Sequence, residues 1–190
     1  MGKIILCRGK KADTPLTVLQ TGVKLYTAEE LCYYIYNNIY LIGQDFIDDN
    51  LISFLDETGE KELAERVRKL KETGGSLAQI FVIILKTIDY YSVAEIEQLK
   101  EILNTLGKQS VCERLKARGD GYLNAGYYFA AVRCYESIIK DYKGKDLLAA
   151  DYAKVYHNLG TAYARMFMYD KAVIYYDEAY RTGQHEESKK

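Results

Sequence analysis

A set of small and aromatic residues occurs twice in the last third of the chain, and the two sets lie 41 residues apart. A glycine and a tyrosine three positions apart share one face of a helix, and an alanine and a tyrosine four apart share one face of another. Small residues let antiparallel helices approach closely, and aromatic rings fill the space beside them. The spacing therefore predicts two helical hairpins. In each, the first helix carries the glycine and a tyrosine, and the second helix carries the alanine and another tyrosine. The predicted packing residues are Gly119, Tyr122, Ala131 and Tyr135 in the first hairpin and Gly160, Tyr163, Ala172, Tyr176 and Ala179 in the second.

The charge and proline content limit what such a chain binds and how it folds. Its 190 residues carry a net charge of −1, so no strong field attracts nucleic acid or anionic lipid. We therefore expect neither nucleic acid nor a membrane as a partner. Pro15 is the only proline, which permits long helices.

The cysteines show no metal-binding or disulfide framework. They form no CxxC pair, and only His157 and His185 could join them as zinc ligands. The first residues hold too short an apolar run for a secretory signal. We expect reduced cysteines in a cytoplasmic protein without a metal or another cofactor.

The first 26 residues contain the strand-forming segments. Residues 4–6, 16–19 and 23–26 are short β-prone runs, and Gly22 precedes the last of them, where a hairpin loop needs a positive φ. A lone hairpin is marginally stable, so it must pack on the helices that follow.

From Thr27 to residue 110 the pattern predicts helices. Capping boxes begin at Thr27 and Ser92, and amphipathic helices are expected over 48–58 and 60–72, with a flexible joint at Gly74 and Gly75. Residues 77–91 are apolar nearly all round, which predicts a helix in the centre of the core. We therefore predict an N-terminal region over 1–110 and two helical hairpins with a polar tail over 111–190.

The repeated pattern resembles the tetratricopeptide repeat, a helix–turn–helix unit of roughly 34 residues. The match is dense around Asn158, Gly160 and Ala172 and sparser in the first copy, where Arg118 and Ile138 depart from it. It covers residues 112–182, and residues 1–110 resemble no family that we recognise. The resemblance implies a mainly α fold with hairpins stacked as a short α-solenoid, beside the N-terminal β-hairpin and further packing helices.

The chain departs from this family in two ways. Its period of 41 is longer, and we expect residues 146–150 to lengthen the first helix of the second copy by two turns. The family usually ends in a polar-faced capping helix, whereas residues 181–190 read as a polar tail. Two repeats alone are marginal, so either the N-terminal helices pack on the first copy, or a second molecule covers the exposed end, or the chain is a fragment of a longer one.

In the family, the first helices of successive repeats line a groove that binds a peptide or a partner helix. The resemblance thus implies a non-enzymatic interaction module or scaffold. Some relatives clamp a C-terminal carboxylate with lysine and asparagine; Lys116 and Asn158 suit that role, but Asp120 would repel the ligand, so we predict no clamp. The implied groove residues are Glu113, Lys116, Asp120, Asn124, Lys154, His157, Asn158, Thr161 and Arg165.

Two alternatives remain. The apolar second helix with Val173, Tyr176 and Tyr180 has nothing after it in the pattern to cover it, which would suit pairing of two copies as a homodimer. An enzyme with its site in residues 1–110 is the other. We identify no catalytic residue, because His157 has no nucleophile or third group beside it in the pattern, and we therefore expect no enzymatic activity.

Overall fold

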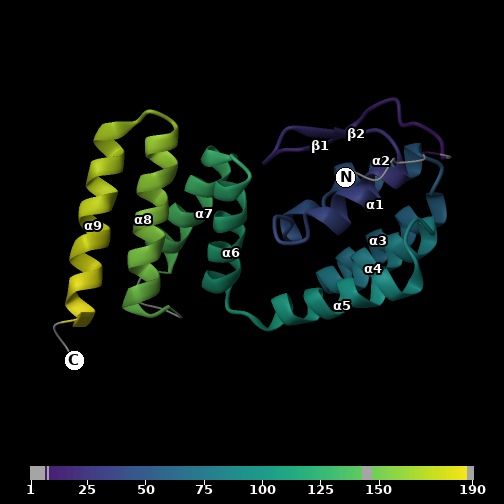
Figure 1. The fold of residues 1–190 in the computed structure, drawn as a ribbon. Coiled ribbons are helices and arrows are strands. Elements are labelled where there is room, and N and C mark those ends of the chain that lie inside the picture. The colour runs from purple at the N-terminus through teal and green to yellow at the C-terminus, as the bar shows by residue number, and fades with distance from the viewer. Residues whose placement is uncertain (1–6, 8, 143–146, 188–190) are drawn as a thin grey trace. The chain divides into compact units, whose positions relative to one another are not determined.

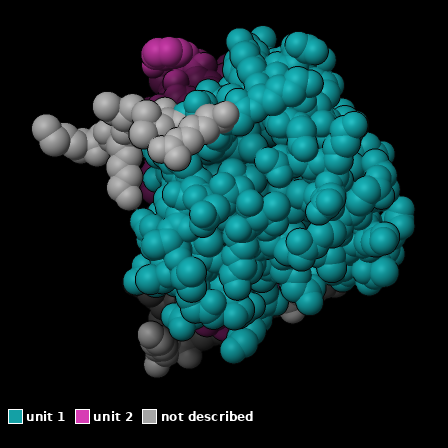
Figure 2. Space-filling view, turned by 90° about the vertical axis from the view of Figure 1, so that its right-hand side faces the viewer, with its two compact units in different colours: residues 1–108 teal, residues 109–190 magenta. Residues whose placement is uncertain are grey.

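Helices dominate the chain, as the pattern of apolar residues predicts. A computed structural model describes Cys7 and residues 9–142 and 147–187, with the backbone alone over 184–187. Over these residues it shows nine α-helices, a short 3₁₀ helix and a two-stranded sheet (Figure 1). The prediction of a mainly α fold with a small β-hairpin is confirmed. The chain divides into unit 1, residues 1–108, and unit 2, residues 109–190, which Figure 2 colours separately.

The β-hairpin of unit 1 pairs β1 (Leu16–Val18) with β2 (Val23–Leu25) in antiparallel register, Val18 opposite Val23. Gly22 takes a φ of 71° before β2, a conformation that glycine adopts without strain. Each strand is one residue shorter than predicted, and the expected strand over 4–6 lies outside the described residues. The buried side chains of Leu16, Val18 and Leu25 tie the hairpin to the core of unit 1.

The first helices of unit 1 begin and end at the residues that their caps dictate. α1 (Ala28–Asn37) starts with the capping box of Thr27 and Glu30, and η1 (Gln44–Phe46) leads to α2 (Asp49–Glu57), capped by Asp48. After α3 (Lys61–Glu72), the amide of Gly75 donates to the Leu70 carbonyl at 2.7 Å. With Gly74 at a φ of 73°, this is a hydrogen-bonded helix end in place of the predicted flexible joint.

The centre of unit 1 is α4 (Leu77–Ile88), which α5 (Val93–Lys108) follows. Ile80, Phe81, Ile84 and Leu85 are fully buried, while Val82 and Ile83 on the other side are only partly covered. The predicted buried helix over 77–91 therefore exists, but it ends earlier and buries one face rather than its whole circumference.

Unit 2 consists of two helical hairpins. α6 (Val111–Asn124) pairs with α7 (Tyr128–Asp141), and α8 (Ala149–Arg165) pairs with α9 (Tyr169–Glu187). α8 also packs against α6 and α7, so it lies between the first hairpin and α9 (Figure 1). The first helix of the second hairpin, α8, thus covers the second helix of the first hairpin, α7.

One prediction about unit 2 is wrong. α8 has 17 residues against 14 in α6, so it is longer by three residues rather than by two turns. It begins after Leu148, which places Asp151 in the first turn, where the helix dipole favours a carboxylate. The polar segment after Tyr180 continues α9 as a helix as far as Glu187, and Arg181 forms ion pairs with Asp177 and Glu178 one turn earlier.

Candidate protein-interaction face

In each hairpin of unit 2, a glycine of the first helix admits a tyrosine ring from the second. A Cβ atom added to Gly119 would lie 2.7 Å from Cε1 of Tyr135, and one added to Gly160 would lie 2.9 Å from Cδ1 of Tyr176. Both distances are shorter than van der Waals contact, so only glycine leaves room for the ring at its present position. Of the other packing residues, Tyr122, Ala131, Tyr163 and Ala172 are each at most 6% exposed, and Ala179 is half-buried.

A polar junction joins the first hairpin to α8. The Tyr135 hydroxyl donates to Asp120 at 2.7 Å, and Nδ2 of Asn158 donates to the same carboxylate at 2.9 Å. Nζ of Lys116 pairs with its other oxygen at 2.8 Å. Burial, and then the hydrogen bond to Asp120, raise the pKa of the Tyr135 phenol. Three helices are held in register through one carboxylate.

This junction involves three of the predicted groove residues. Lys116 and Asn158 each bond to Asp120, so the atoms that a carboxylate clamp would use already have partners. Glu113 has a local role, because its carboxylate accepts from the amide of Ser110 and completes the capping box of α6. The polar centre of the implied groove is therefore a structural contact between the hairpins.

The remaining groove residues separate into two groups. Thr161 and His157 lie toward α9: the Thr161 and Tyr176 hydroxyls are 3.1 Å apart, and the His157 and Tyr176 rings are 5.2 Å apart. Within the described residues, no hydrogen bond or ion pair joins the other three to another predicted groove residue, and all are exposed. These three are Asn124, Lys154 and Arg165.

A second interhelical contact was not found from the sequence. The Tyr163 hydroxyl of α8 donates to Oε1 of Glu136 on α7 at 2.8 Å, and burial together with this carboxylate raises the pKa of Tyr163. The Tyr163 ring also stacks on Tyr175 of α9 at 5.4 Å. The polar tips of the tyrosines thus find partners while their rings pack.

The second helices of the two hairpins differ in exposure at equivalent positions. Val132 of α7 is 7% exposed, whereas Val173 of α9 is 67% exposed. Tyr135 is fully buried, whereas Tyr176 is 37% exposed. The reason is that α8 packs over α7, while no described element of unit 2 packs over α9 in the same way.

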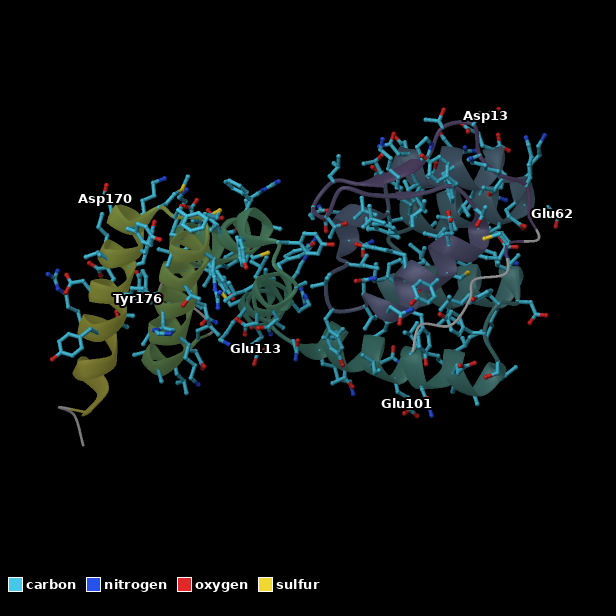
Figure 3. The ribbon with its side chains drawn as sticks, turned by 45° about the horizontal axis from the view of Figure 1, so that its top comes forward. Asp13, Glu62, Glu101, Glu113, Asp170 and Tyr176 are labelled. Atoms are coloured by element: carbon cyan, nitrogen blue, oxygen red, sulfur yellow. The ribbon has the colours of Figure 1, made fainter. Side chains whose placement is uncertain are left out.

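Four of the exposed apolar residues of α9 follow a heptad spacing, and Ile174, which is 59% exposed, lies outside it. Tyr169, Val173, Tyr176 and Tyr180 are separated by four, three and four positions, so they form one stripe along the helix. We call these four residues the α9 seam. Figure 3 labels Tyr176, midway along α9, and Asp170, at its start. The sequence pattern pointed to Val173, Tyr176 and Tyr180, and the heptad spacing would also have identified Tyr169.

Phe167 extends this apolar surface from the turn before α9. It is 79% exposed and takes a φ of 62°, where the first hairpin has Gly126 with a φ of 82°. In both turns the residue that follows donates its amide to the carbonyl of a buried tyrosine, Tyr122 or Tyr163, at 2.9 Å. A left-handed conformation costs a non-glycine residue about 1–2 kcal/mol. The second hairpin therefore keeps an exposed ring at a strained position beside the seam.

The described residues of unit 1 show no comparable stripe of exposed apolar side chains. A hollow of about 490 Å³ lies among α3, α4 and α5, and Lys100 is the only ionisable residue among its described lining residues. Within the described part of the chain, no three metal-ligating side chains come together, and no helix is long and apolar enough to cross a membrane. Cys32 is buried, which raises its thiol pKa and disfavours the reactive thiolate.

We compared the chain with protein-family models, with curated proteins and with solved structures. None of the three comparisons found a match. The contrast between the covered α7 and the exposed α9 is therefore the observation on which a functional proposal depends.

Proposed function

We propose that the protein is a non-enzymatic protein–protein interaction module whose α9 seam binds a helix of another protein. The resemblance of unit 2 to tetratricopeptide repeats supports a binding role. We place the binding site on α9, however, and not in the groove that the resemblance implies. Lys116 and Asn158 are both bonded to Asp120, so the partner contacts α9 and the adjoining His157 and Thr161 rather than the centre of the groove.

The exposed stripe on α9 is the observation that carries this proposal. The equivalent stripe on α7 is covered by a helix, α8, so the repeat itself provides an example of the covered state. Large apolar side chains gathered on one helix face are typical of interaction sites. The seam residues are 60%, 67%, 37% and 64% exposed in chain order.

Pairing of two copies through the same seam is the alternative function. An isologous pair would bring each seam against the seam of its partner and would need no second protein. Sedimentation at micromolar concentration distinguishes the two, since the heterologous proposal predicts a monomer.

The proposal is tested by selecting helices on the full-length protein. A display library of helices of about 21 residues, three heptads with a fixed apolar stripe and varied flanks, is panned against the wild type. Selected helices are then titrated against the double variant Val173→Gln/Tyr180→Gln. Glutamine is polar and favours helix, and both sites are exposed, so the variant keeps its fold.

A matched control replaces an apolar residue of α7 that is as exposed as the seam. Phe129 is 70% exposed and lies off the seam, so Phe129→Gln should leave binding unchanged. We expect selected helices to bind the wild type and Phe129→Gln equally and to lose at least about tenfold in affinity on the seam variant. Failure to enrich any helix that distinguishes the seam variant would refute the proposed function.

A further inference from the structure

The exposed flank of the α9 seam is acidic. Asp170 follows Tyr169 and Asp177 follows Tyr176, so in the heptad both occupy the same position beside the stripe. Both are exposed. The opposite flank holds Ala172, which is 3% exposed and packs into the hairpin. A helix lying on the seam therefore has one open side, which presents these two carboxylates together with Ile174 and Arg181, the ion-pair partner of Asp177.

The first hairpin shows how such a carboxylate is used when the face is covered. Glu136 of α7 stands where Asp177 stands in α9, and each forms an ion pair one turn on, with Lys140 at 3.3 Å and with Arg181 at 2.7 Å. Glu136 also receives the hydroxyl of Tyr163 from the covering helix at 2.8 Å. Asp177 has no such interhelical donor among the described residues.

Asp170 has even fewer interactions. Within the described part of the chain it forms no ion pair and no side-chain hydrogen bond. Its place in the first turn of α9 is favourable for a carboxylate but leaves both oxygens available to a donor from outside. A cationic side chain on the bound helix would supply that donor.

A second copy of this chain supplies less cationic charge than its own carboxylates require. An antiparallel two-fold pair of α9 seams places the same flank of each helix against the other, which brings together the four carboxylates of Asp170 and Asp177 and only two cations, the Arg181 side chains. In head-to-tail stacking of two copies, α6 of one copy would have to cover α9 of the other, as α8 covers α7 within one copy. The positions of Val155 and Leu159 in α8 are taken by Arg114 and Arg118 in α6, so α6 lacks that apolar face.

We propose that the partner of the α9 seam is a basic amphipathic helix, with an apolar stripe and lysine or arginine beside it. This inference rests on the proposed function and adds the chemical class of the partner. The apolar stripe covers Val173 and Tyr180, and the basic side chains pair with Asp170 and Asp177. The pairs are exposed to solvent, so they set the preference for one helix over another more than the total affinity.

Two synthetic helical peptides of about 21 residues test this assignment. They share one leucine stripe and differ only in carrying lysine or glutamate at the flanking positions. Binding to the full-length protein is followed by fluorescence anisotropy at about 0.05 M and about 0.2 M salt. We expect the lysine peptide to bind about tenfold more tightly at low salt and the difference to shrink at high salt.

Two variants assign the effect to the named residues. Asp170→Asn/Asp177→Asn removes the charge without the shape and should bring the two affinities within about threefold of each other. Val173→Gln/Tyr180→Gln should weaken both peptides, because it removes the stripe that they share.

Each of the remaining outcomes would refute a specific part of these proposals. Equal binding of both peptides, still dependent on the seam, would refute the basic partner and leave the proposed function intact. Binding of neither peptide, while the library yields seam-dependent helices with neutral or acidic flanks, would do the same. A dimer in sedimentation that Val173→Gln/Tyr180→Gln dissociates would assign the seam to a second copy instead.

Discussion

The two glycines that admit tyrosine rings allow one substitution to be compared in a covered and an uncovered hairpin. Replacing Gly119 with alanine would place Cβ 2.7 Å, 2.9 Å and 3.1 Å from three ring atoms of Tyr135. That ring is fully buried and its hydroxyl is bonded to Asp120, so it cannot move aside without losing the polar junction. Overpacking costs about 1–3 kcal/mol, and a broken hydrogen bond adds about 1 kcal/mol.

Alanine in a helix regains about 1 kcal/mol over glycine, so the expected net loss for Gly119→Ala is about 1–3 kcal/mol. In Gly160→Ala the Cβ meets the Tyr176 ring at 2.9 Å and the Ala172 carbonyl oxygen at 3.2 Å. The ring is 37% exposed and can swing outward, and the carbonyl contact needs a shift of only a few tenths of an ångström. The helical gain should then nearly offset the clash, which leaves a net change of about 0–1 kcal/mol.

Hydrogen exchange of the amides of α6–α9 in increasing urea measures the stability of unit 2 separately from that of unit 1. Gly107→Ala is the control, since its Cβ would meet nothing within 4 Å and should stabilise α5 by up to about 1 kcal/mol. Equal effects of Gly119→Ala and Gly160→Ala, or stabilisation by the former, would refute the argument that covering by α8 fixes the Tyr135 ring.

Three further predictions concern single residues of unit 2. Phe167→Gly should stabilise unit 2 by about 1 kcal/mol in the same exchange assay, because it relieves the positive φ; a loss would show that the exposed ring contributes packing. Asn158→Leu should destabilise unit 2 by about 1–3 kcal/mol, since it removes a donor to the Asp120 carboxylate, and an unchanged stability would contradict the role of the junction. Because the pKa of Tyr135 is raised, its phenolate should form at a higher pH than that of an ordinary tyrosine in an absorbance titration. Its neutral form stabilises the fold below the unfolded phenol pKa of about 10, and this contribution is lost as pH rises from there through the folded pKa; Tyr135→Phe should remove that loss.

Local rules predicted most of the elements. The capping residues Thr27 and Ser92 and the turn glycine Gly22 determine chain direction through their own hydrogen bonds and dihedral angles, which depend little on distant contacts. The spacing of Gly119 and Tyr135 likewise predicted helices whose packing can be read from residue size. The ends of α8 and α9 could not be placed, because no proline or capping glycine marks them in the sequence.

The candidate site was only partly accessible from the sequence. The second copy of the repeat pattern pointed to the exposed Val173 and Tyr180, because the pattern showed no helix after them. The groove inference assigned Lys116 and Asn158 to a ligand, whereas they bond to Asp120. Which polar residues on a helical face bond to one another depends on the distance between helices far apart in the sequence, and a repeat pattern does not contain that distance.

Hydroxyl-radical footprinting of the tyrosines tests the central claim most directly, because it reports whether α9 is open where α7 is covered. In the free protein at low micromolar concentration, Tyr169 and Tyr180 should be oxidised rapidly, while Tyr122 and Tyr135 should be protected. Addition of the lysine peptide should then protect Tyr180 without changing Tyr122. Protection of Tyr180 equal to that of Tyr135 in the free protein would contradict the account, because it would mean that the α9 seam is already covered.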